Sequence, residues 1–225
     1  MFPISLNLHN KQVIMFGAGR VGQRKLIKLI TAGARIRVVE PHPGEEVKEL
    51  ARNGAIELFA SLSPDLFEGV SLAFAATGHP ELNQDLAREA QARGIWVNVA
   101  DAPELSDFFL PAVLEQGCIQ LTVATGGSSP ALSAKIAEEL RTRYGPEYGR
   151  LAVLMAELRP MILSSGLDGQ ARNETFKRLI DSKKLLQALA RHDQKELLAL
   201  LTEILKPIRL PSGFNPSAGK TGPDS

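Results

Sequence analysis

Residues 12–40 constrain this chain more than any other stretch, because a short apolar run, a glycine-rich turn, an apolar-faced helix and a second apolar run follow one another there. The run QVIMF leads into GAGRVG, and the run IRVV ends at Glu40. This order predicts a strand, a tight turn, a helix and a second parallel strand. Gly17 would allow the turn, Gly19 would let the backbone approach a pyrophosphate, and Gly22 would let the helix pack closely on the sheet. The stretch therefore predicts a dinucleotide-binding unit.

The acid that closes this stretch favours NAD over NADP. Glu40 lies about 20 residues beyond the glycines, where a carboxylate accepts hydrogen bonds from the adenosine ribose and repels a ribose 2′-phosphate. Arg37 could weaken this preference, but the alternation of the strand points it away from the face that carries the neighbours of Glu40. The N–H groups of the helix's first turn would face the phosphates. We expect the NAD cofactor to be bound by Gly17, Gly19, Arg20, Val21, Gly22, Glu40 and Thr77.

The helix after the glycines has a predicted apolar stripe and a basic start. Its stripe is predicted to comprise Leu26, Ile27, Leu29 and Ile30. Arg20, Arg24 and Lys25 lie near its N-terminus, where cations oppose the helix dipole. We expect these side chains either to be solvated or to meet carboxylates or phosphates of bound ligands.

The composition is that of an ordinary globular protein without bulk charge. The 225 residues include 26 Lys and Arg against 25 Asp and Glu, and 44% are hydrophobic. We therefore expect neither nucleic acid nor a membrane as a partner. Cys118 is the only cysteine, which excludes an internal disulfide and fits a reducing cytosol. The absence of a long apolar run and of a signal-peptide pattern leads us to expect a cytoplasmic protein.

Further apolar runs alternate with helical segments up to residue 106. AIELF, SLAFAAT and IWVNVA predict three more strands, and EEVKELARNG and residues 80–93 predict helices. This order indicates an α/β fold, a Rossmann-type doubly wound parallel sheet that binds ligands outside the carboxyl ends of its strands. Thr77 and Asp101 follow two strands at that edge. Residues 1–10 alternate apolar with other residues and predict an edge segment leading into the sheet.

The pattern changes after residue 106. FFLPAV and IQLTVA are joined by LEQG without a crossover helix, which predicts an antiparallel pair. TGGSSP then predicts a helix capped by Ser128 or Ser129, with Pro130 in its first turn. We predict a Rossmann domain at 1–106, a small α+β domain at 107–146, a helical domain at 147–206 and a disordered tail at 207–225.

Several segments together resemble one protein family. In order and spacing, GAGRVGQRK, the strand-end Glu40, AATGHPELN, VNVADAPELSDFFLPA and ATGGSSPALSAKI are similar to the precorrin-2 dehydrogenase and sirohydrochlorin ferrochelatase family, found as the N-terminal region of sirohaem synthases. The resemblance covers about residues 1–160 closely. It implies NAD-dependent oxidation of precorrin-2 to sirohydrochlorin in sirohaem biosynthesis, and a homodimer whose second domain, residues 107–146, is built by two chains. Insertion of Fe²⁺ into sirohydrochlorin belongs to only some relatives, so this second activity stays open.

The resemblance also assigns residues to substrate and catalysis. The family's essential aspartate corresponds to Asp101, which could act as a general base. The loop that approaches the tetrapyrrole corresponds to Thr125, Gly126, Gly127, Ser128, Ser129 and Pro130. Because precorrin-2 is a polycarboxylate, Arg24 and Lys135 are predicted to bind it, within a basic patch that also includes Arg20, Lys25, Arg141 and Arg143. No Cys and His cluster with metal-ligand spacing is present, so we predict no resident metal, and Fe²⁺ would be a substrate.

Two other functions remain compatible with the sequence. An NAD-dependent dehydrogenase of another small substrate would use the same first domain without needing the basic patch. A dinucleotide-sensing regulatory protein would need only residues 17–40. Asp101 and the TGGSSP loop discriminate between these classes, because a sensor has no need to place them across a cleft from its nucleotide.

Overall fold

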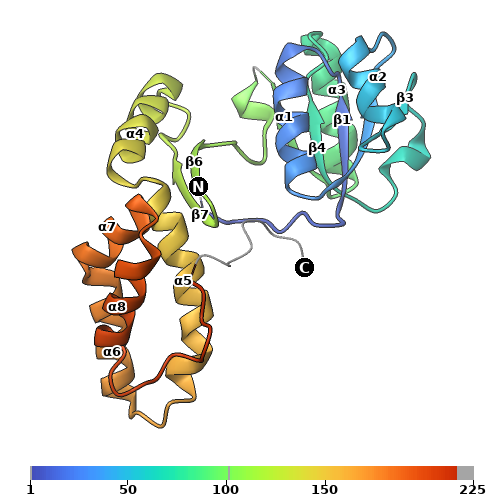
Figure 1. The fold of residues 1–225 in the computed structure, drawn as a ribbon. Coiled ribbons are helices and arrows are strands. Elements are labelled where there is room, and N and C mark those ends of the chain that lie inside the picture. The colour runs from blue at the N-terminus through green and yellow to red at the C-terminus, as the bar shows by residue number, and fades with distance from the viewer. Residues whose placement is uncertain (1, 101, 217–225) are drawn as a thin grey trace. The chain divides into compact units, whose positions relative to one another are not determined.

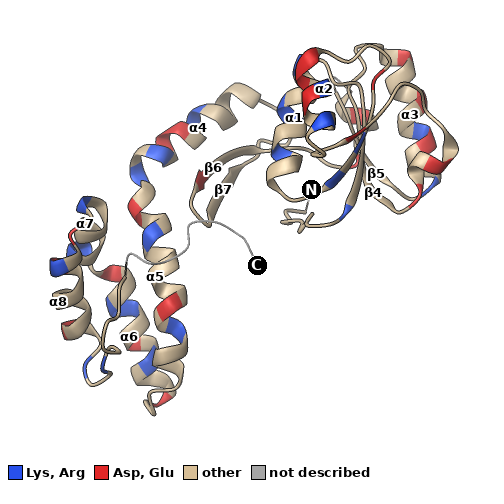
Figure 2. Cartoon of the chain, turned by 45° about the vertical axis from the view of Figure 1, so that its right-hand side comes forward, with Lys and Arg blue, Asp and Glu red and all other residues tan. Residues whose placement is uncertain are grey.

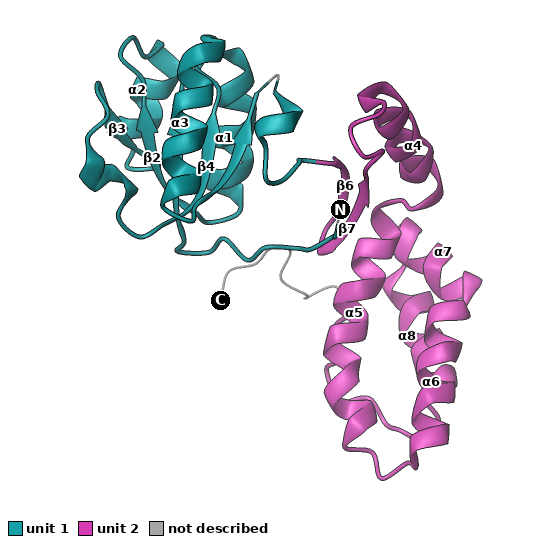
Figure 3. Ribbon diagram, turned by 180° about the vertical axis from the view of Figure 1, so that it is seen from behind, with its two compact units in different colours: residues 1–110 teal, residues 111–225 magenta. Residues whose placement is uncertain are grey.

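The chain forms two compact units, residues 1–110 and 111–225 (Figures 1 and 3). The computed structural model describes residues 2–100 and 102–216. Two clusters of buried side chains lie within the first unit and another within the second. Each unit therefore has a hydrophobic core of its own.

The first unit is built on a parallel five-stranded sheet with the order β3-β2-β1-β4-β5. The strands are β1 (Gln12–Phe16), β2 (Arg35–Val39), β3 (Glu57–Phe59), β4 (Val70–Ala75) and β5 (Trp96–Val99). The helices are α1 (Arg20–Thr31), α2 (Glu45–Arg52) and α3 (Pro80–Ala92), with short 3-10 turns η1 (Pro64–Phe67) and η2 (Pro103–Leu105). The predicted Rossmann-type sheet is confirmed.

Side chains that alternate along β1 reach both faces of the sheet. Val13 and Met15 pack with residues of α1 and α2, whereas Ile14 and Phe16 pack with residues of α3 and η1. All four side chains are at most 1% exposed. A central parallel strand covered on both faces reads as a continuous apolar run, as QVIMF does. Helices on both faces make the sheet doubly wound.

Ser106 and Asp107, and not another strand, form hydrogen bonds with the outer edge of β5. The Asp107 carboxylate accepts the Val97 N–H at 2.9 Å, and the Asp107 N–H donates to the Val97 carbonyl at 2.8 Å. The Ser106 hydroxyl accepts the Val99 N–H at 2.9 Å. Polar groups that an edge strand would leave open are therefore paired within the unit.

Two predictions for the first unit are wrong. Residues 2–8 form no strand, and Phe2, Ile4 and Leu6 are exposed, Phe2 by 87%, while Leu8 packs against the core. In α1, Ile27 is 61% exposed while Leu26 and Leu29 are buried. Successive helical residues are separated by about 100°, and the inner face of α1 is centred on Gly22, Leu26 and Leu29, so Ile27 falls outside it.

The second unit begins with a hairpin, followed by five helices among the described residues. The hairpin pairs β6 (Ala112–Gln116) with β7 (Ile119–Val123) in antiparallel fashion. The helices are α4 (Pro130–Arg143), α5 (Pro146–Leu163), α6 (Gly169–Asp181), α7 (Lys183–Arg191) and α8 (Gln194–Ile204). The small antiparallel sheet followed by helices agrees with the predicted fold class.

The hairpin starts later than the sequence predicted. The expected first run was FFLPAV at 108–113 with LEQG as the loop, but Leu114, Glu115 and Gln116 belong to β6. The turn is formed by Gly117 and Cys118, and Gly117 takes the left-handed conformation with φ of +60°. A two-residue turn with a glycine of positive φ allows the strands to pair up to its edges.

The apolar helical stripes form the core of the second unit. Leu151, Leu154 and Leu158 of α5 pack with Leu197 and Leu201 of α8. Ile208, Leu210 and Phe214 also pack against this cluster. The described part of the predicted disordered tail, 207–216, therefore lies on the helices, because its three apolar side chains are buried there in part. Residues 217–225 lie outside the described residues.

Candidate functional site

Gly17 brings the end of β1 against the end of β4. A Cβ atom at Gly17 would lie 2.3 Å from the Ala76 carbonyl oxygen and 2.6 Å from Thr77 Cα, and the φ of Gly17 is +84°. Both the contact and the backbone conformation require glycine here. Thr77 therefore lies beside the glycine turn, at the carboxyl edge of the sheet.

Gly22 and Gly19 serve the same turn in different ways. A Cβ at Gly22 would lie 2.5 Å from the Gly17 carbonyl oxygen, so α1 packs directly on the turn. A Cβ at Gly19 would meet no atom of the described residues within 4 Å. No side chain in that part of the chain caps the first turn of α1, where Arg20 and Val21 lie exposed. The open backbone at this helix N-terminus fits an anionic pyrophosphate.

The Glu40 carboxylate is fixed beside this turn. Its Oε2 accepts the Ala18 N–H at 2.9 Å and its Oε1 accepts the His42 N–H at 3.0 Å. Each carboxylate oxygen has two lone pairs, so both can accept a further hydrogen bond. Ribose hydroxyls of a dinucleotide lying over Gly17 to Gly22 would supply the donors. The geometry therefore fits the role predicted for Glu40.

Arg37 is held by groups other than Glu40. Its guanidinium donates to the carbonyls of Leu66 and Glu68 at 2.9 and 3.0 Å. It also lies 3.6 Å from the Glu57 carboxylate. A ribose 2′-phosphate would have to compete with these partners.

Thr77 is tied to α3 by the buried side chain of Asn83. Asn83 Oδ1 accepts the Thr77 N–H at 3.0 Å and the Thr77 hydroxyl at 2.7 Å. The Thr77 hydroxyl also accepts the His79 N–H at 3.2 Å. Asn83 was not predicted as a site residue, because the sequence does not show which group its side chain meets.

Lys25, which the sequence placed in the predicted basic patch, contacts other side chains within the first unit. Its ammonium donates to Asn98 Oδ1 at 2.6 Å and lies 5.6 Å from the centre of the Phe74 ring. Asn98 in turn donates to the Phe108 carbonyl at 2.9 Å. Lys25 therefore links α1 to β5 and to the segment that leaves the sheet. Asp101, the predicted catalytic residue, lies outside the described residues.

The predicted tetrapyrrole loop lies in the second unit, at the start of α4. The Thr125 hydroxyl accepts the Ser129 N–H at 3.1 Å and lies 3.1 Å from the Ser133 hydroxyl. The Ser129 hydroxyl accepts the Leu132 N–H at 3.2 Å and caps the helix. Gly126 and Gly127 both have positive φ, and with Ser128 and Pro130 they are exposed. Serine and threonine hydroxyls thus hold a loop whose glycines face solvent.

The predicted cations of α4 are paired or stacked locally. Lys135 lies 3.9 Å from the Glu139 carboxylate and Arg141 lies 3.1 Å from that of Glu138. Arg143 stacks on Tyr144. Acidic and basic residues are interspersed along this helix (Figure 2), whereas the charged residues of α1 are all basic. Among the described residues, Arg20 and Arg24 form no ion pair.

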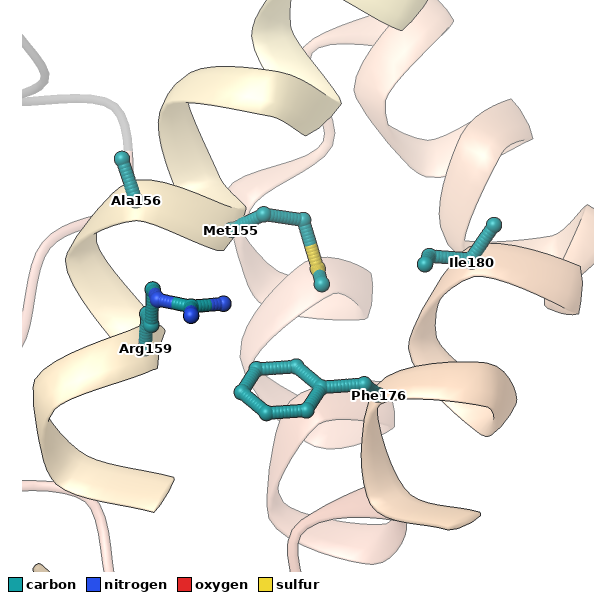
Figure 4. A pocket seen from close by; sticks show the side chains of 5 residues that line it. All are labelled: Met155, Ala156, Arg159, Phe176 and Ile180. Atoms are coloured by element: carbon teal, nitrogen blue, oxygen red, sulfur yellow. The ribbon is translucent and has the colours of Figure 1, made fainter. Parts of the chain in front are cut away.

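A pocket of about 350 Å³ lies between α5 and α6 of the second unit. Met155 and Arg159 face Phe176 and Ile180 across it (Figure 4). It shares no residue with the predicted site. In the described part of the chain, no three His, Cys, Asp or Glu side chains gather as a metal site would require, and no helix has the length and apolarity to cross a bilayer.

Comparisons with known proteins bear on this geometry. Residues 4–112 match the model of a family described as "Putative NAD(P)-binding". Siroheme synthases from Chromobacterium violaceum and Ectopseudomonas mendocina are 36% and 38% identical to this chain over 80% and 76% of its length. The chain is thus similar to siroheme synthases over most of its own length. The resemblance predicted from the sequence is confirmed, and the first unit is a nicotinamide dinucleotide-binding domain.

The chain spans less than half the length of the siroheme synthases that it matches. It covers 38% of the Chromobacterium protein and 37% of the Ectopseudomonas protein. A solved structure named SirC, precorrin-2 dehydrogenase, has a TM-score of 0.72 and 22% identity, over 91% of this chain and 98% of that one. At that identity the likeness shows the fold.

Proposed function

We propose that this chain is an NAD-dependent dehydrogenase that oxidises precorrin-2 to sirohydrochlorin. The observation that carries the proposal is the turn Gly17–Gly22, with Glu40 fixed at its side, in a chain whose relatives are siroheme synthases. The structural neighbour named precorrin-2 dehydrogenase supports the same substrate. The reaction removes a hydride, which bound NAD⁺ accepts, and a proton from the macrocycle.

Residues of this chain would bind the cofactor and take the proton. The open backbone of Gly19, Arg20 and Val21 would hold the pyrophosphate, and Glu40 the adenosine ribose. The pairing of Arg37 with other groups supports NAD over NADP. Asp101 would accept the proton from the substrate. Arg24 and the loop Thr125–Pro130 would bind carboxylates of the tetrapyrrole, and Lys135 would do so after leaving Glu139.

The decisive experiment gives purified protein NAD⁺ and precorrin-2 and follows NADH and sirohydrochlorin by absorbance. The wild type should form both in equal amounts. Asp101→Ala should lose this activity while calorimetry shows unchanged NAD⁺ binding. Full turnover by the alanine variant would remove Asp101 from the mechanism. NAD⁺ binding without turnover, even with the wild type, would favour a dinucleotide-sensing protein or a dehydrogenase of another small substrate.

We propose two further properties. Insertion of Fe²⁺ into sirohydrochlorin, with iron as a substrate, is tested by the loss of free sirohydrochlorin against a no-enzyme control. A cytoplasmic homodimer that shares the domain 107–146 is tested by sedimentation of the full chain. In the described part of the chain, no third strand pairs with the β6–β7 hairpin. This supports such sharing, because unpaired strand edges can pair between chains.

A further inference from the structure

Asn83 is one of four buried polar residues in the described part of the chain, with 5% of its surface exposed. It lies in the first turn of α3. Its side chain accepts two hydrogen bonds from Thr77, which follows β4. A buried amide that accepts two hydrogen bonds from one residue holds both the backbone and the side chain of that residue. Asn83 therefore determines how Thr77 is presented.

The hydrogen bonds of the Thr77 hydroxyl leave one of its lone pairs free. A hydroxyl has one proton and two lone pairs. One lone pair accepts the His79 N–H at 3.2 Å. The proton is directed to Asn83 Oδ1 at 2.7 Å, a shorter contact than the 3.3 Å to the His79 carbonyl. What remains is one lone pair, so the hydroxyl can only accept a hydrogen bond from a ligand.

The position of Thr77 puts this acceptor next to the dinucleotide turn. Thr77 Cα lies 2.6 Å from the place where a Gly17 Cβ would stand. The side chain is partly exposed, and the residue follows β4 at the carboxyl edge of the sheet. Ligands of such sheets lie outside this edge.

We propose that Asn83 is a positioning residue that holds the Thr77 hydroxyl as an acceptor toward the nicotinamide dinucleotide. The recognised group is a hydrogen-bond donor of the cofactor, either a ribose hydroxyl or the NH₂ group of the carboxamide. This inference rests on the proposed dinucleotide function and deepens it. Asn83 acts through Thr77 and need not touch the cofactor itself.

The test measures the Kd for NAD⁺ by calorimetry on the full chain. Thr77→Val removes the hydroxyl and keeps the shape, and it should weaken binding about fivefold, as the loss of one neutral hydrogen bond does. Asn83→Leu should weaken binding by a similar factor. The double variant should be no weaker than the weaker single variant, because both changes remove the same interaction. Thr77→Ser retains the hydroxyl and should restore binding to within about twofold.

Controls separate positioning from a general loss of stability. Asn98→Leu removes another buried amide of the first unit, at 7% exposure, which has no bond to Thr77. It should lower the melting temperature of the free protein and leave the Kd unchanged. Wild-type affinity in folded Thr77→Val, multiplicative losses in the double variant, or an equal loss in Asn98→Leu would each overturn the proposal.

An analogue distinguishes the two donor groups. The 3-acetylpyridine analogue of NAD⁺ carries a methyl group in place of the carboxamide NH₂ group. If Thr77 accepts a hydrogen bond from that NH₂ group, Thr77→Val will not change the affinity for the analogue. If Thr77 accepts a hydrogen bond from a ribose hydroxyl, Thr77→Val will weaken the binding of the analogue as much as the binding of NAD⁺. A wild-type protein that binds no NAD⁺ would instead refute the dinucleotide function on which the inference rests.

Discussion

Gly17 and Gly19 have different surroundings in the same turn, and this difference separates folding from binding. Gly17 has a positive φ and no room for a Cβ, whereas Gly19 has ordinary φ of −67° and open space around it. A side chain at Gly17 must move backbone atoms of Ala76 and Thr77. A side chain at Gly19 meets only what binds there.

The two alanine variants should therefore fail in different ways. Gly17→Ala should lower the free energy of unfolding by more than about 1 kcal/mol, since it combines a strained φ with a backbone clash. Gly19→Ala should keep the melting temperature of the free protein but weaken NAD⁺ binding at least about tenfold, because its methyl group would occupy the approach of the pyrophosphate. Calorimetry and thermal melts measure both effects. Unchanged NAD⁺ affinity in Gly19→Ala would place the phosphates elsewhere.

The charge of Glu40 is expected to set the choice between the two dinucleotides. Glu40→Gln keeps the shape and an acceptor for one backbone N–H but removes the repulsion of a 2′-phosphate. The ratio of NADP⁺ to NAD⁺ affinity should rise about tenfold, which corresponds to 1.4 kcal/mol. Competition of the two cofactors in equilibrium binding measures this ratio. Glu49→Gln, at an exposed position of α2 with no ion pair among the described residues, is the matched control and should leave the ratio as it is.

The glycines and Glu40 could be predicted from the sequence because their spacing follows from the length of one helix and two strands. Asn83 could not, because its partner depends on how the chain turns back between β4 and α3. The bond between Lys25 and Asn98 was hidden for a similar reason. It joins residues 73 positions apart, and only the packing of α1 on the sheet brings them together.

At the scale of elements, α4 has a defined start because Ser129 caps it. Ser129→Ala should lower the free energy of unfolding by about 1 kcal/mol, the usual cost of losing an N-cap oxygen. Ser128→Ala is the matched control, since the exposed Ser128 does not cap the helix. Chemical denaturation of both variants measures the difference. Equal losses of stability would show that the cap bond is not what stabilises the start of α4.

Element types followed from the sequence more reliably than element limits. Apolar runs and the connections between them predicted the five parallel strands and the hairpin. The limits of β6 depended on a two-residue turn at Gly117 and Cys118, which the longer apolar run FFLPAV obscured. Ile27 was misplaced because four apolar residues in a row of five, 26–30, do not indicate which of them is at the margin of the buried face.

At the scale of the whole molecule, each unit has its own core, so the two should unfold in separate steps. Leu158 is fully buried in the core of the second unit. Leu158→Ala should cost about 2–5 kcal/mol in that unit and leave the other transition in place. NAD⁺ should raise only the transition of the first unit, because a ligand stabilises what it binds. Scanning calorimetry with and without NAD⁺ measures both. A single transition that responds to both changes would contradict this expectation.

Ser106 and Asp107 affect how the protein can associate with other polypeptides. A neighbouring polypeptide that approached the margin of β5 at Val97 and Val99 would find their amide hydrogens already taken, so it could not add itself to the sheet there. This edge of the sheet is thus protected against aggregation by strand addition. A polypeptide that pairs with this protein by strand addition must do so at another edge.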